Sequence, residues 1–320
     1  MTQRKLNSNG FGNGLKFVKK AHCYRTLVVD GTPGRCSIEG NQCRYCYDQR
    51  YSGVREMHQS ELGKQLDLGL VVRQLQDTNK KVGKWARKYE GVRIGALGDI
   101  MEDEHDLYIT LLSILGANKV RPTLVTKSSH TIDWYILNEL KEAGGVLQPS
   151  MGFYTPEVAQ LFERVGRIPP SGRRKMIEEA LKMDIPVVLR LNPMHPDYMW
   201  DHLRVLQWFA SVGGKRVILE VMRIMSRWAT DMPGVDFSSF VPYGDGPNDG
   251  WYRQYRSPSR NTTWKMLEVM LKAAELEGIE AITICGWMEA NDKVGYRAKE
   301  IDCCQLCDIW GTERPPRSWD

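Results

Sequence analysis

Residues 26 to 46 read TLVVDGTPGRCSIEGNQCRYC, and this stretch decides which fold we expect. The apolar run Thr26–Val29, rich in β-branched residues, predicts a short buried strand that ends at Asp30. A glycine-rich loop then presents three thiols, those of Cys36, Cys43 and Cys46. Three thiolates can bind three irons of a cubane cluster and leave the fourth iron open to a small ligand. The stretch therefore predicts a strand followed by an iron–sulfur loop.

Beyond this loop, short β-rich runs alternate with helical patterns, which is typical of βα units and a parallel sheet. The seven predicted strands are Thr26–Val29, Val92–Leu97, Pro122–Thr126, Gly145–Met151, Val187–Leu191, Arg216–Met222 and Ile279–Cys285. The predicted helices are Glu61–Tyr89, Glu104–Ala117, Ile132–Ala143, Pro156–Arg164, Gly172–Met183, Trp200–Ser211 and Thr263–Glu277, with Ser171 as a candidate N-cap. We therefore expect an α/β fold, a partial (β/α)6-type barrel with a seventh strand.

The expected organisation has three parts: a basic N-terminal extension over residues 1–25, the barrel over 26–285, and a cysteine-containing C-terminal extension over 286–320. One irregular stretch, Ala229–Thr262, carries four prolines with many Gly, Asp and Ser residues. Because it is too long for a simple connection, it is a candidate lid or substrate loop.

The cysteine loop resembles the signature of the radical S-adenosylmethionine (SAM) superfamily, Cys-x3-Cys-x-aromatic-Cys. Residues 43–46, Cys-Arg-Tyr-Cys, match its second half, whereas six residues separate Cys36 from Cys43. Four further segments resemble the spore photoproduct lyase-like branch of that superfamily. They are Arg93–Asp99, Leu124–Ser128, Gln148–Met151 and the run from Phe162 to Pro193. The resemblance implies a radical SAM barrel with a 4Fe-4S cluster on Cys36, Cys43 and Cys46, SAM as cofactor, and an external electron donor of flavodoxin or ferredoxin type.

The resemblance also implies where SAM binds, because a barrel collects its ligand-binding groups at the carboxyl ends of its strands. It assigns Tyr45, Gly98 and Asp99, Lys127, Ser150, and Arg190 with Asn192 to the cofactor. The Gly98–Asp99 pair would meet the SAM ammonium, Lys127 the carboxylate, and the others the ribose or carboxylate. Taken singly, these residues have ordinary explanations as a turn, a solvated cation or a helix cap. Their shared place at predicted strand ends favours binding.

Two residues are candidates for catalysis. Glu220 lies inside the apolar run Val217–Met222, where an inward carboxylate is costly unless it is paired or functional. A salt bridge with Arg190 or Arg216 is one interpretation, and contact with the substrate is the other. Cys285 ends the seventh predicted strand, and its thiol could return a hydrogen atom to a substrate radical, as in some lyases of this resemblance.

A second cysteine group, Cys285, Cys303, Cys304 and Cys307, is a candidate auxiliary site for a second iron–sulfur cluster or zinc. Buried thiols without metal are the plain alternative. A zinc site that joins Cys43 and Cys46 to Cys304 and Cys307 would instead make the chain a zinc-stabilised nucleic-acid-binding protein without catalysis.

The composition and the charge limit the classes of function that the chain can have. Hydrophobic residues make up 42% of the chain and charged residues 26%, which excludes a mainly disordered protein. The N-terminal residues 1–14 are polar, and no apolar run reaches the roughly 18 to 20 residues that a membrane span needs, so we expect a cytoplasmic protein without a membrane partner. Residues 1–55 hold ten basic and three acidic residues, within an overall charge of only +5.

For the substrate, the resemblance favours a nucleobase, such as a modified or damaged thymine in DNA, or a nucleoside, with lyase, isomerase or hypermodification chemistry. The segments Arg173–Lys175 and Trp251–Arg260 supply basic and aromatic side chains suited to phosphate contacts and base stacking. Solvated surface charge is the alternative for both segments. A radical SAM enzyme that modifies a peptide or amino acid with an auxiliary cluster fits the same residues.

Overall fold

The computed structural model describes residues 14–17, 27–29, 43, 66–89, 91–95, 99–100, 102–128, 132–163, 169–225, 232–242, 255–285 and 302–313. Cys36, Tyr45, Cys46 and Gly98 lie outside these residues. So does the part of the basic and aromatic segment from residue 251 to 254.

The described strands build one parallel row in which each new strand lies beside the previous one. The parallel strands are β2 (Leu27–Val29), β3 (Gly91–Ile94), β4 (Arg121–Thr126), β5 (Val146–Pro149), β6 (Val188–Met194), β7 (Arg216–Val221) and β11 (Ala281–Ile284). Parallel bridges from Leu147 to Val187 and from Ser150 to Arg190 join β5 to β6. All seven predicted strands are confirmed, and their sequential order without a reversal is the order of a βα-barrel.

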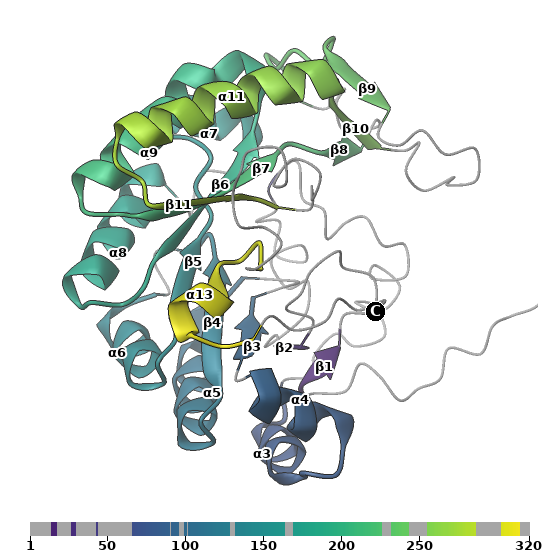
Figure 1. Ribbon diagram of the computed structural model, residues 1–320, viewed down its shortest axis with the longest axis vertical. Coiled ribbons are helices and arrows are strands. Elements are labelled where there is room, and N and C mark those ends of the chain that lie inside the picture. The colour runs from purple at the N-terminus through teal and green to yellow at the C-terminus, as the bar shows by residue number, and fades with distance from the viewer. Residues whose placement is uncertain are drawn as a thin grey trace, which may run out of the picture.

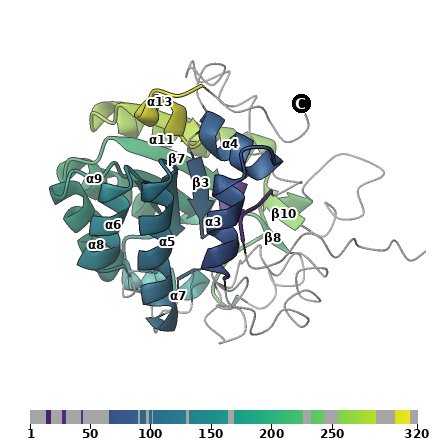
Figure 2. The same ribbon diagram turned by 90° about the horizontal axis from the view of Figure 1, so that it is seen from below.

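An antiparallel strand, β1 (Lys16–Phe17), pairs with β2 and extends this row at one edge. The row forms an arc with helices along its outer side (Figure 1). Figure 2 shows several of these helices side by side. The described helices that connect successive parallel strands therefore lie on the same side of the sheet, as βα units require.

The helices between the strands are amphipathic, and their apolar stripes pack on the outer face of the row. They are α3 (Leu68–Gln76), α4 (Lys81–Tyr89), α5 (His105–Ala117), α6 (Trp134–Glu142), α7 (Pro156–Phe162), α8 (Pro170–Lys182), α9 (Met199–Ser211) and α11 (Arg260–Leu276). In α5 the buried residues are Tyr108, Leu111, Leu112 and Leu115, which follow the three-four spacing of one helix face.

Two details of the helices differ from the expectation. The predicted helix Glu61–Tyr89 is two helices within residues 66–89, because the chain turns after Asp77, and its first five residues lie outside the described part of the chain. Gly83 lies close to this turn, since a Cβ there would be 2.2 Å from the Asp77 carbonyl oxygen. The predicted N-cap Ser171 is wrong, because α8 begins one residue earlier at Pro170 and places Ser171 inside its first turn. Proline fits the first helical position because its missing N–H has no partner there in any helix.

Alternate strand residues face opposite sides of the row. Leu147, Leu189 and Leu219 belong to the large core that includes the helices. Their neighbours Val146, Val188 and Ile218 face the inner side, where they pack with Cys304, Leu306 and Trp310. This part of the inner face is thus covered by the C-terminal segment, residues 302–313, which contains α13 (Leu306–Trp310) and lies across the strands in Figure 1.

Part of the predicted irregular stretch, residues 229–262, forms two strands, which pair with a third strand that precedes the stretch. β8 (Ile224–Met225), β10 (Tyr255–Pro258) and β9 (Phe240–Pro242) make a small antiparallel sheet. A second apolar cluster joins this region to the end of β5 and to α7 through Phe153, Phe162, Met232, Phe237 and Phe240. None of the described helices is both long and apolar enough to span a lipid bilayer.

Candidate active site

The carboxyl ends of the strands bring predicted site residues from distant parts of the sequence together, and we call this edge the rim. Lys127 follows β4, Ser150 follows β5, Arg190 and Asn192 lie in β6, Glu220 lies in β7, and Cys285 follows β11. The registers pair Ser150 with Arg190 directly, and the Cys285 amide donates to the Leu219 carbonyl beside Glu220. These side chains therefore form a polar row on the inner side of the rim.

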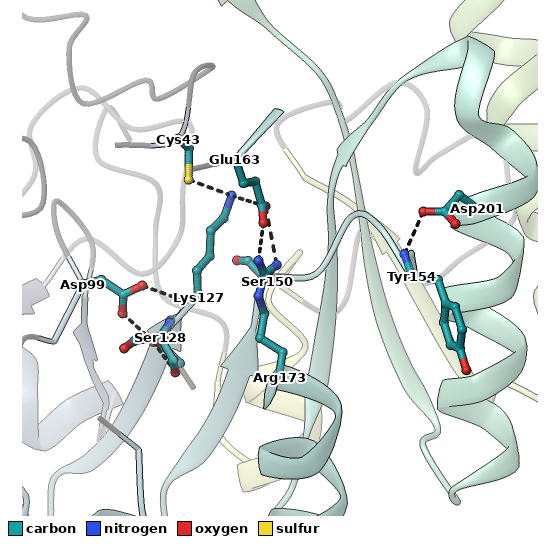
Figure 3. Close-up of polar contacts among 10 residues, drawn as sticks. Cys43, Asp99, Lys127, Ser128, Ser150, Tyr154, Glu163, Arg173 and Asp201 are labelled. Atoms are coloured by element: carbon teal, nitrogen blue, oxygen red, sulfur yellow. Dashed lines mark hydrogen bonds and ion pairs between the residues drawn. The ribbon is translucent and has the colours of Figure 1, made fainter. Parts of the chain in front are cut away.

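Lys127 is held both at its backbone N–H and at its side-chain ammonium (Figure 3). Its backbone N–H donates to Asp99 Oδ2 at 2.8 Å. Its Nζ lies 3.8 Å from Cys43 Sγ and 3.7 Å from Glu163 Oε1. The contact with Cys43 joins the predicted cluster loop to the end of β4, across 84 residues of sequence.

Asp99 acts on the backbone at this point. Its Oδ1 accepts the hydroxyl of Thr126 and the N–H of Ile100, while its Oδ2 accepts the N–H of Lys127. Burial raises the pKa of Asp99 above its ordinary value of 3.8, and the hydrogen bonds from Thr126 and Lys127 oppose that effect. The resemblance assigns Asp99 to the SAM ammonium, whereas its hydrogen bonds with Thr126 and Lys127 fix the end of β4.

Glu163 and Arg173 form a buried ion pair behind Lys127. Their side chains are 2% and 1% exposed, and Arg173 Nη2 contacts Glu163 Oε2 directly. A second Arg173 nitrogen, Nη1, donates to the Ser150 carbonyl at 3.1 Å. The expectation that Arg173 contacts phosphate on the surface is therefore wrong, because its guanidinium is enclosed and paired.

Arg190, Glu220 and Cys285 meet on the other half of the rim. Arg190 Nη2 donates to Glu220 Oε2 at 2.6 Å and lies 3.7 Å from Cys285 Sγ. Burial acts to raise the pKa of Glu220, but the charges of Arg190 and Arg223 and a hydrogen bond with Asn192 outweigh it and leave the pKa below 4.5. Of the two partners expected for Glu220, the structure selects Arg190, while Arg216 pairs with Asp308.

The loop after β5 is fixed from the outside of the rim. Asp201, which is fully buried, accepts the backbone N–H groups of Tyr154 at 2.7 Å and Thr155 at 3.3 Å (Figure 3). His202 Nδ1 donates to the Gly152 carbonyl at 2.6 Å, and its Nε2 accepts the His195 N–H at 2.8 Å. Burial lowers the pKa of His202, so the ring is neutral and can perform both roles. These contacts fix the backbone between Ser150 and α7.

The second cysteine group has mainly packing contacts. Cys304 and Leu306 pack on the inner face, and the carbonyls of Cys304 and Cys303 accept from Gln148 and Thr283. Cys307 Sγ accepts the N–H of Asp302 at 3.0 Å. Among the described residues, no three His, Cys, Asp or Glu side chains are placed to bind one metal ion. Cys43, Cys304 and Cys307, three of the four cysteines of the zinc hypothesis, are described and are not placed to bind one metal ion together.

Sequence reasoning missed some of the rim. It did not select Glu163, Thr126 or Asp201 as site residues, and it placed Arg173 on the surface. Glu163 follows a seven-residue helix directly, and no spacing rule links it to Lys127. The family resemblance covers the segment that begins at Phe162, and both Glu163 and Arg173 lie in that segment. This resemblance was the signal that could have pointed to them.

The comparisons agree with the architecture. No protein-family description and no curated protein sequence matches the chain significantly. Several solved structures do match the chain. A cysteine-to-serine mutant of spore photoproduct lyase is similar with a TM-score of 0.59 over 84% of this chain and 78% of that one, at 15% identity. The chain has the fold of spore photoproduct lyase.

Two further structures carry a ligand. A double mutant of spore photoproduct lyase with bound AdoMet (SAM) and dinucleoside spore photoproduct gives a TM-score of 0.57 at 13% identity, over 85% of this chain and 80% of that one. The protein anSMEcpe with bound AdoMet gives 0.53 at 13% identity, over 80% of this chain and 60% of that one. The predicted α/β fold, a parallel sheet with helices along one side, is therefore confirmed.

Proposed function

We propose that the protein is a radical SAM enzyme that binds a 4Fe-4S cluster through Cys36, Cys43 and Cys46 and SAM along the rim. The contact between Cys43 Sγ and Lys127 Nζ supports this assignment most directly, because it joins the cysteine loop to a cation at a strand end. A thiol beside a polar row of cations, carboxylates and an amide suits a ligand that carries a carboxylate, an ammonium and a ribose. The described donors, Cys43 and the side chains of the rim, therefore suit the cofactors that the fold implies.

When bound and reduced by an external donor of flavodoxin or ferredoxin type, the cluster would supply the electron that cleaves SAM to methionine and a 5′-deoxyadenosyl radical. The residues of the chain bind and orient the reactants. Lys127 attracts the SAM carboxylate, and Ser150 with Asn192 donates or accepts hydrogen bonds toward the ribose. Arg190 and Glu220 form a fixed ion pair beside Cys285, the candidate hydrogen-atom donor.

For the substrate, we propose a nucleobase in DNA or a nucleoside. A structural neighbour holds dinucleoside spore photoproduct, which motivates this choice. Lys175 is exposed on α8, and Arg174 is partly exposed beside it, so two of the three basic residues expected to contact phosphate still have access to solvent. We likewise propose that the reaction is of the lyase, isomerase or hypermodification class.

The cofactor assignment is tested on protein purified without oxygen. We expect a brown preparation whose broad absorption is bleached by dithionite and which cleaves SAM reductively. Cys43→Ala should abolish cleavage, while the matched variant Cys303→Ala, from the other cysteine group, should keep the cluster and the cleavage. A colourless preparation with stoichiometric zinc, or full cleavage by Cys43→Ala, would overturn the assignment.

The substrate assignment needs a separate measurement. We expect anaerobic incubation with SAM, dithionite and ultraviolet-damaged, thymidine-containing DNA to change the nucleosides released by digestion, as detected by mass spectrometry. Undamaged DNA of the same sequence is the matched control. SAM cleavage without any change in either DNA would contradict the nucleobase proposal and leave the cofactor proposal standing.

A further inference from the structure

Glu163 is a buried carboxylate at the rim, and it is not among the residues proposed above to bind the cofactors or the substrate. It comes directly after α7, and its side chain is 2% exposed. Figure 3 shows it between Arg173 on one side and Lys127 on the other. Its Oε1 lies 3.4 Å from Arg173 Nη1 and 3.7 Å from Lys127 Nζ, and its Oε2 contacts Arg173 Nη2.

The charges of this group explain why a carboxylate is needed. Arg173 and the Lys127 ammonium both pair with Glu163, so removing this carboxylate would take one negative charge away from two cations of low solvent exposure. A buried charge is stable only when it is paired and hydrogen-bonded. Among these three side chains, one carboxylate faces two cations, which leaves one positive charge on the side of Cys43.

The geometry also restricts Lys127. A lysine ammonium sits on a flexible four-carbon stem, and ordering such a stem on ligand binding costs affinity. Glu163 holds Nζ before any ligand arrives, and Arg173 holds Glu163 through two nitrogens while it also binds the Ser150 carbonyl. The chain from Ser150 through Arg173 and Glu163 to Lys127 thus connects the ends of the adjacent strands β5 and β4.

We infer that Glu163 is a positioning residue, which holds the Lys127 ammonium beside Cys43 in the place where it binds the carboxylate of SAM. This inference rests on the proposed function. Glu163 itself does not contact the cofactor; it acts through Lys127 and is held by Arg173. The expected consequence is a preference for ligands that carry the carboxylate.

The test compares two ligands that differ by that one group, SAM and decarboxylated SAM. Equilibrium dialysis on the cluster-loaded protein, without oxygen and without reductant, measures Kd for each while no cleavage occurs. In Glu163→Gln we expect SAM to bind about tenfold more weakly, as for loss of a charge-assisted contact, while decarboxylated SAM changes by less than about twofold. Lys127→Met should give the same pattern, and the double variant should be no weaker than the weaker single variant.

Two variants keep the result interpretable. Glu163→Asp retains the negative charge and should recover part of the SAM affinity, and it supplies the comparison if Glu163→Gln folds poorly. Glu280→Gln removes an exposed ion pair with Lys215 and should change neither Kd. Equal weakening of both ligands by Glu163→Gln, or unchanged or tighter SAM binding, would overturn the inference. A wild-type protein that binds neither ligand would instead refute the proposed function.

Discussion

Glu220 shows how a single neighbour determines the state of a carboxylate in an apolar strand. Val217, Ile218 and Leu219 are fully buried, and the strand then brings Glu220 to the rim with its side chain 21% exposed. Arg190, which the register places on the adjacent strand, keeps the carboxylate ionised. Both interpretations of Glu220 remain compatible with this pair, because an ion pair at the rim can also meet a substrate.

The pair predicts a pH dependence of stability. The folded-state pKa of Glu220 lies below its ordinary value of 4.5, so the contribution of the carboxylate is present above that pH and is lost as the pH falls through the folded value. Glu220→Gln should lower the free energy of unfolding by about 1–3 kcal/mol at pH 7. Denaturant titrations should show this difference shrinking below pH 4.5, and a constant difference down to pH 3 would contradict it.

Cys285 gives a prediction about the reaction. If its S–H bond breaks as a C–H bond of the product forms, a wild-type reaction in D2O should place deuterium in the product, because thiols exchange with solvent. Cys285→Ser should still cleave SAM but lose most of this label, as read by mass spectrometry. Cys303→Ala is the control from the same cysteine group. Full labelling by Cys285→Ser would exclude Cys285 as the donor.

At the scale of elements, the loop between β5 and α7 and the small antiparallel sheet share one apolar cluster around His195. The His195 ring lies 5.0 Å from the Phe240 ring and 5.5 Å from the Phe162 ring, centroid to centroid. Burial is the largest cause that lowers the pKa of His195 to about 4, and the proximity of the second imidazole, His202, acts in the same direction. The cluster therefore requires a neutral imidazole.

This requirement predicts a loss of stability in mild acid. Between pH 6.5 and about 4, His195 is protonated in the unfolded chain but not in the folded chain. The free energy of unfolding therefore falls by up to about 1.4 kcal/mol for each unit by which the pH decreases. His195→Asn should remove this dependence. His105 is the opposite control, because its hydrogen bond with Asp133 raises its pKa and His105→Asn should cost stability mainly in acid. Denaturation at pH 7 and pH 5 measures both.

The C-terminal segment gives a second prediction at this scale. Leu306 is 1% exposed and packs against the inner face beside Cys304. Leu306→Ala should destabilise the protein by about 2–5 kcal/mol, since it leaves a cavity there. The buried thiols of Cys304 and Cys307 should then react faster with a thiol reagent, while Leu276→Ala, at an exposed position, should change neither quantity. Unchanged thiol reactivity would show that the segment does not cover the inner face.

At the scale of the whole molecule, charge on the outside can be related to the proposed substrate. The Arg204 guanidinium lies over the rings of Tyr154 at 4.6 Å and Trp200 at 6.0 Å, and Arg174 lies over Tyr154 at 4.2 Å. Trp200 is 50% exposed in the first turn of α9. Because helices begin where the preceding strands end, this group lies near the rim.

These side chains suit phosphate and base contacts, which predicts a salt-dependent affinity for DNA. Arg204→Glu with Lys175→Glu should weaken binding of a thymidine oligonucleotide about tenfold or more and flatten the decrease of affinity with salt. Lys272→Glu, on the exposed side of α11, is the matched control. Fluorescence anisotropy at several salt concentrations measures the slopes, and identical slopes for all three proteins would contradict the prediction.

The sequence was sufficient for the fold because its information there is local. Apolar runs bounded by turns predict each strand, and βα alternation fixes their order, so Lys127, Arg190 and Glu220 could be placed at one edge, where the strands end. Side-chain partners were harder to predict, because they depend on rotamers and on approach between distant elements. Arg173 illustrates this: its sequence neighbours are polar, and only the packing of α8 against the rim turns it inward.

The C-terminal segment also has a consequence for biosynthesis. A ribosome makes β1 and β2 first and residues 302–313 only after every described strand of the sheet, yet these late residues cover part of the inner side of strands made long before them. The nascent chain must therefore keep that apolar surface open throughout translation of the domain.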